Sequence, residues 1–150
     1  MKVNNLLFYI TKSANKNTVV YTYQCHEDKS LDVLNPVKAH WIMREQEGDP
    51  IEDLTFMEAK LAYGYNIESI EDDRVFFTIT PLKEQHVLTI KKRDSKYVAL
   101  IHLETKEYIL KKVFVQLDEG VMMDSVQYLK LYLEDQETGE ITHANILNED

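Results

Sequence analysis

Three side chains that can carry a positive charge fall on one face of an alternating segment, residues 37–44. They are Lys38, His40 and Arg44. Alternate residues of a strand point to the same side, so the opposite face holds Val37, Ala39, Trp41 and Met43. We expect the apolar face to meet the core, and the cationic face to lie in solvent or to line a barrel mouth. At a barrel mouth these cations, joined by Lys60 and Tyr63, would bind an anionic group such as a carboxylate.

The patterns that could bind metal are incomplete. Residues 25–28 are Cys, His, Glu and Asp, but consecutive residues at a strand end point in opposite directions and rarely converge on one ion. The segment from Asp28 departs from a calcium loop at Val33, where glycine is needed, and at Ala39, where glutamate is needed. The remaining histidines fall in separate segments, and the sequence leaves open whether any of them meet. We predict no metal and no other cofactor.

Local catalytic motifs are also missing from the sequence. There is no G-x-S-x-G nucleophile elbow and no glycine-rich phosphate loop, and a single cysteine excludes a Cys-x-x-Cys pair. An enzyme would need a site assembled from distant residues, such as His40 with a carboxylate. The sequence therefore favours a non-catalytic protein, with an enzyme as the third alternative.

The elements that must position these residues are mainly strands. Short runs rich in Val, Ile, Phe, Tyr and Leu alternate with turn residues along the chain. The expected strands are residues 6–12, 18–25, 37–44, 65–70, 74–80, 86–92, 97–104, 107–117, 126–134 and 140–147. This rhythm predicts a single domain, residues 1–150, of the mainly β class. We expect an antiparallel meander that forms a closed or partly open barrel, with a two-sheet sandwich as the alternative.

One short helix interrupts the strands. Thr55 and Glu58 have the spacing of a capping box, in which each side chain accepts a hydrogen bond from the other residue's amide. Apolar residues follow at helical spacing, and Gly64 can adopt the left-handed conformation that ends a helix. Because such a helix is too short to be stable alone, we expect it to pack on the sheet.

Composition limits the partners and the compartment. The net charge of −9 disfavours nucleic acid, because an acidic chain repels phosphate groups. No apolar run approaches the roughly 20 residues needed to span a bilayer. The single cysteine, Cys25, excludes an internal disulfide and fits a reducing compartment. No signal peptide is visible, which predicts a cytoplasmic location unless a leader has been removed.

Several short segments occur in an order that resembles a known family. They are residues 35–38 (Asn-Pro-Val-Lys), 40–43 (His-Trp-Ile-Met), 54–55 (Leu-Thr), 60–64 (Lys-Leu-Ala-Tyr-Gly) and 113–116 (Val-Phe-Val-Gln). The pattern resembles a family of small bacterial proteins known only as a domain of unknown function. The resemblance spans nearly the whole chain and implies a bacterial origin and one compact domain. It carries no catalytic or binding residues.

Two functions remain close on sequence alone. The first is a small-molecule binding module that takes an anionic or amphipathic ligand, because barrels of eight or more strands can enclose one. The second is an interaction or structural domain that self-associates into a homo-oligomer, because open sheets must cover their edge strands. Fold analogy favours the first.

Overall fold

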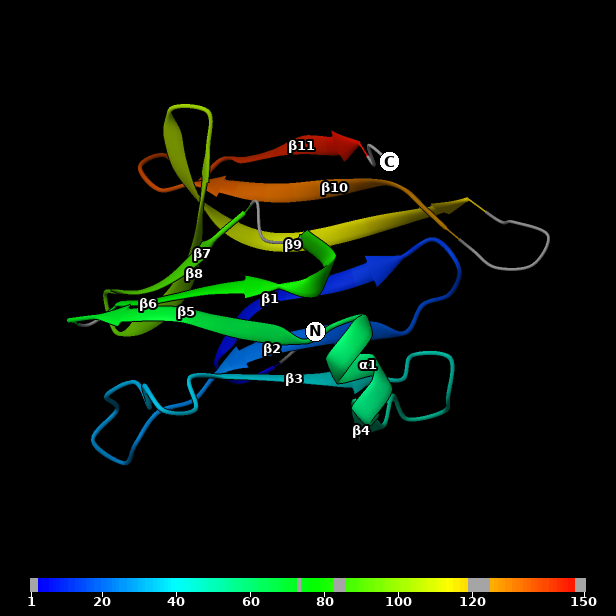
Figure 1. The fold of residues 1–150 in the computed structure, drawn as a ribbon, viewed down its shortest axis with the longest axis horizontal. Coiled ribbons are helices and arrows are strands. Elements are labelled where there is room, and N and C mark those ends of the chain that lie inside the picture. The colour runs from blue at the N-terminus through cyan, green and yellow to red at the C-terminus, as the bar shows by residue number, and fades with distance from the viewer. Residues whose placement is uncertain (1–2, 73, 83–85, 119–124, 148–150) are drawn as a thin grey trace.

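The computed structural model describes residues 3–72, 74–82, 86–118 and 125–147. These residues form eleven strands, one α-helix and one 3₁₀ turn (Figure 1). In chain order the elements are β1 (Leu6–Lys12), β2 (Thr18–Tyr23), β3 (Val37–Ile42), β4 (Ile51–Asp53), α1 (Phe56–Leu61), β5 (Tyr65–Glu71), β6 (Arg74–Ile79), η1 (Thr80–Leu82), β7 (Leu88–Arg93), β8 (Lys96–Leu103), β9 (Lys106–Asp118), β10 (Ser125–Asp135) and β11 (Ile141–Leu147).

The long strand β9 organises the sheet. Along one edge it pairs with β10, which in turn pairs with β11. Along its other edge it pairs first with β8 and then with β1. The sheet therefore divides at β9 into two wings, β1-β2-β3-β4 and β8-β7-β6-β5. In Figure 1 the second wing lies across the first, which gives a curled half-barrel.

This architecture confirms the predicted mainly β class, the partly open barrel and the single short helix. One pairing departs from an antiparallel meander, because β1 and β9 run parallel, from Tyr9 opposite Lys112 to Lys12 opposite Val115. Parallel neighbours need a long crossover connection. Here the connection between β1 and β9 is the whole chain from β2 to β8. Because no short hairpin joins the two strands, they are free to run parallel.

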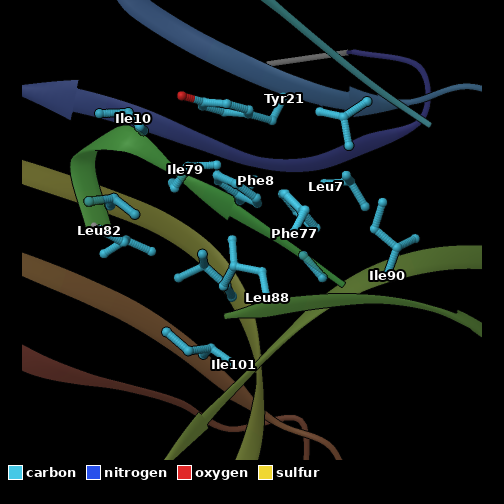
Figure 2. Close-up of a cluster of buried hydrophobic side chains, with 14 of the residues drawn as sticks. Leu7, Phe8, Ile10, Tyr21, Phe77, Ile79, Leu82, Leu88, Ile90 and Ile101 are labelled. Carbon is cyan, nitrogen blue, oxygen red and sulfur yellow. The ribbon is translucent and has the colours of Figure 1, made fainter. Parts of the chain in front are cut away.

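The core fills the space between the two wings. Figure 2 shows Leu7, Phe8 and Ile10 of β1 and Tyr21 of β2 facing side chains of the other wing. The facing residues are Phe77 and Ile79 of β6, Leu82 of η1, Leu88 and Ile90 of β7 and Ile101 of β8. Phe8 stacks on Tyr21 with ring centroids 4.7 Å apart. Side chains thus occupy the inside of the half-barrel in this region.

Acidic residues with positive φ lie between several of the paired strands. Asp94 and Glu104 take positive φ values of 57° between β7 and β8 and between β8 and β9. Asp72 likewise has a φ of 51°, whereas the next residue, Asp73, lies outside the described residues. Short polar side chains tolerate this left-handed conformation better than β-branched ones, which explains why Asp recurs between strands.

Candidate functional site

Strand β3 places its two faces as the alternation predicts, except that Ile42, which alternates with Lys38 and His40, is also buried. Val37 and Trp41 are buried in the core, and Ala39 and Met43 pack against it. On the opposite face Lys38 is exposed and His40 is half-buried. Arg44 lies beyond the strand end and pairs with Asp49, with 3.7 Å between Nη1 and Oδ2. Lys38 and His40 therefore share a side of β3, whereas Arg44 lies outside the strand and is already paired with a carboxylate.

His40 has an environment that disfavours its charge. Burial and the nearby Lys38 lower its pKa below the ordinary value of 6.5, and Asp53, its cross-strand neighbour on β4, opposes this shift. Its Nδ1 is buried and makes no hydrogen bond to the described residues. His40 is thus neutral at neutral pH and lies opposite a carboxylate, the arrangement expected if it took part in acid–base chemistry.

Tyr63 lies on the other side of β3. Its ring meets Trp41 edge-on at 5.2 Å and 79°, and its carbonyl oxygen accepts a hydrogen bond of 2.7 Å from Tyr21 Oη. Burial, followed by the charge of Glu58, raises the pKa of Tyr63. Since His40 and Trp41 are consecutive strand residues, their side chains point to opposite faces. The structure therefore separates Tyr63 from the cations that the sequence grouped with it.

The helix α1 is held beside β3 mainly by one carboxylate. Glu58 Oε1 accepts hydrogen bonds from the Thr55 amide (2.8 Å) and from Trp41 Nε1 (3.1 Å), and Thr55 Oγ1 accepts from the Glu58 amide (3.1 Å). The predicted capping box is confirmed. Burial would raise the pKa of Glu58, but these hydrogen bonds and nearby Lys12 outweigh burial and lower it.

Two expectations for the helix are wrong. No residue of α1 is buried, and Phe56, Met57 and Leu61 are 77%, 58% and 62% exposed. A polar tether, rather than an apolar face, holds the helix to the sheet. Gly64 also lacks a left-handed φ. It is required for a different reason, because a Cβ there would overlap the carbonyl oxygen of Ala59.

Ala59 and Gly64 both line a groove between α1 and the hairpin β5–β6. The main pocket has a volume of about 490 Å³. It is lined by Ala59, Lys60, Gly64, Tyr65, Asn66, Thr78, Ile79 and Thr80. A second pocket of about 320 Å³ adjoins it, since Ala59, Gly64 and Tyr65 line both. We call these two pockets together the α1 groove.

The α1 groove contains one of the five predicted site residues. Lys60 lines the main pocket, with its Nζ 5.8 Å from the centre of the Phe56 ring, and the lining residues include no carboxylate. Lys38, His40, Arg44 and Tyr63 do not line either pocket. Sequence reasoning missed Tyr65, Asn66 and the two threonines. The only available signal was the hairpin pattern, since β5 and β6 pair Asn66 with Thr78.

Comparison with known proteins places the chain in a family. A family model described as "Domain of unknown function (DUF4833)" matches residues 8–144. The chain belongs to this family. The match confirms the predicted resemblance to a domain of unknown function, and it covers most of the chain. No curated protein and no solved structure matches it.

Two features are absent from the part of the DUF4833 domain that the structure describes. No group of three or more His, Cys, Asp and Glu side chains is arranged to hold a metal ion. No described helix is long and apolar enough to cross a membrane. Among the features described above, the α1 groove combines volume, a cation and polar lining groups in one place.

Proposed function

We propose that this DUF4833 domain is a non-catalytic binding module that holds a small amphipathic anion in the α1 groove. The observation that carries this proposal is the position of Lys60. It contributes a cation to a pocket of about 490 Å³ that contains the polar groups of Asn66, Thr78 and Thr80. Pockets of this size, with few polar groups among apolar ones, are typical ligand sites.

The surroundings of the groove favour a ligand with an apolar part. Phe56, Met57 and Leu61 expose most of their surface on α1, the helix that contributes Ala59 and Lys60 to the groove, although none of the three lines either pocket. Exposed apolar side chains that gather in one place commonly mark a binding surface. Asp53 lines the second pocket, so an anionic head group would avoid that end and approach Lys60.

The filled interior supports a site at the rim rather than inside the barrel. Phe8, Tyr21 and Phe77 are completely buried between the wings and face one another (Figure 2). A ligand there would have to displace well-packed side chains, which costs several kcal/mol, on the order of a large core truncation. The groove beside α1 requires no such displacement.

Native mass spectrometry of freshly purified protein, repeated after denaturation, tests whether a ligand is captured. Titration with decanoate, with decanol as the uncharged control and Trp41 fluorescence as readout, then tests the site. We expect Lys60→Ala to weaken decanoate binding by about fivefold, the value of one exposed charge contact. Lys38→Ala should leave it unchanged. Weaker binding in Lys38→Ala alone would place the anion on the cationic face of β3 and refute the groove.

A second candidate function is self-association, which the uncharged edge strand β11 favours and which is argued below. The geometry supports catalysis less well, because His40 lies on the face of β3 opposite Trp41 and lines neither pocket of the groove. We also propose a cytoplasmic location, which rests on the single cysteine.

A further inference from the structure

Three of the described strands pair on one side only, and they differ in how their free edges are protected. These strands are β4, β5 and β11. Free edges invite pairing with another chain, and proteins normally block this with charged residues, bulges or very short strands. The three edges can therefore be compared within one molecule.

Two of the edges carry such protection. β4 has only three residues, of which Glu52 and Asp53 are acidic. β5 carries Glu68 and Glu71, and its pairing with β6 contains an irregularity between Ile67 and Ser69. A second copy of this acidic chain would meet like charges at either edge, and like charges directly opposite each other destabilise strand pairing.

The third edge has none of these features. β11 is seven residues long, Ile-Thr-His-Ala-Asn-Ile-Leu, with no Asp, Glu, Lys, Arg or Pro. It pairs with β10 in unbroken register from Ile141 to Leu147. Figure 1 shows it as the outermost strand of its part of the sheet. A regular, uncharged edge of this kind is a template for an additional strand.

We propose that the edge of β11 pairs with β11 of a second copy, antiparallel across a two-fold axis at Ala144, to form a homodimer. The strand is self-complementary about this residue. The pairing would place Ile141 opposite Leu147 of the second copy and His143 opposite Asn145 of the second copy. Ile141 and Leu147 are 56% and 68% exposed in the single chain, so each would bury apolar surface against the other.

The inner side of β11 also fits this partner. Thr142, Ala144 and Ile146 border a groove of about 300 Å³ that also involves Leu103 and Tyr108. In the same register, Ile146 of the second copy would lie beside Thr142 and cover part of this groove. The pairing would thus extend the sheet β9-β10-β11 across two chains and place no charged residue of β11 at the junction.

The register can be tested with two double variants that differ in the sign of one charge. In His143→Lys/Asn145→Lys, like charges would face each other twice across the two-fold axis. In His143→Lys/Asn145→Glu, opposite charges would face each other twice. His143 and Asn145 are both exposed in the single chain, and the two variants change the same two positions to long side chains. Ser69→Lys on the edge of β5 is the control for an added charge at another edge.

Sedimentation velocity over a roughly hundredfold range of protein concentration measures the assembly. We expect a dimer for the unmodified chain, for Ser69→Lys and for His143→Lys/Asn145→Glu. We expect the dissociation constant of His143→Lys/Asn145→Lys to rise by at least about tenfold. Circular dichroism must show the same β content in all variants. A monomeric unmodified chain, or a dimer that both double variants leave unchanged, overturns the proposal.

Discussion

Removal of the Glu58 carboxylate should release α1 from the sheet. Its Oε1 accepts both the Thr55 amide and Trp41 Nε1, and no residue of the six-residue helix is buried. A helix this short is unstable without tertiary contacts. Glu58→Ala would therefore remove the capping box, leave the indole N–H without this acceptor and free the wall of the α1 groove that carries Lys60.

The expected cost follows from the two lost hydrogen bonds. A hydrogen bond to a charged group contributes about 1.5–3 kcal/mol when buried. Glu58 is only half-buried, so we expect about 2 kcal/mol in total for Glu58→Ala. For a domain of this size that corresponds to a fall in Tm of roughly 4–8 °C. Glu58→Gln keeps an acceptor oxygen and should lose only about 0.5 kcal/mol.

Thermal and urea unfolding measure the loss, and hydrogen exchange locates it. The amides of Ala59, Ala62 and Tyr63 donate to Thr55 or Glu58 carbonyls, so they should exchange faster in Glu58→Ala than in Glu58→Gln. Trp41 emission should shift to longer wavelength as the indole becomes hydrated. Equal losses in the two variants would show that charge, rather than hydrogen-bond acceptance, holds the helix. Unchanged Trp41 emission in Glu58→Ala would refute the tether.

Three further outcomes follow from other parts of the structure. His40 has a lowered pKa, so stability should fall as the pH drops from about 6.5 through the folded-state pKa, because only the unfolded chain readily takes up the proton. His40→Gln should show a smaller fall in pH-dependent urea unfolding. Gly64→Ala should cost about 2 kcal/mol in the same assay, since the new Cβ overlaps the Ala59 carbonyl. Phe77→Ala removes a completely buried ring and should cost about 4 kcal/mol by calorimetry.

Features set by neighbours along the chain were predictable from the sequence. The alternation around Trp41 gave the correct core face of β3, and the spacing of Thr55 and Glu58 gave the capping box. Both depend on residues within a few positions of one another. Their geometry follows from the two-residue period of a strand and the first turn of a helix.

Features set by distant partners were not predictable. The parallel pairing of β1 with β9 joins residues about a hundred positions apart, and no local pattern encodes its direction. The α1 groove likewise depends on how close α1 comes to the hairpin β5–β6. Gly64 pointed to a special backbone position, but the sequence could not distinguish a left-handed turn from a close contact with Ala59.

The cationic face of β3 gains neighbours from other strands that the local sequence pattern did not predict. His40 belongs to a single row that crosses seven strands on the outer side of the sheet. Its members, in order from β4 to β11, are Asp53, His40, Val20, Tyr9, Lys112, Tyr132 and His143.

Within this row, both His40 and Lys112 have neighbours that can interact with a positive charge. Asp53 faces His40, and Lys112 lies over the rings of Tyr9 (5.8 Å) and Tyr132 (5.1 Å). Cation–π contacts of this kind stabilise the lysine where it is. Burial and the nearby Lys38 keep His40 neutral although it faces a carboxylate. Lys60, on a different element, also lies over a ring, that of Phe56 (5.8 Å), but it lines a pocket whose lining residues include no carboxylate. We therefore propose the helix rather than the strand as the anion site, because Lys60 lines a pocket of the α1 groove and Lys38 and His40 do not.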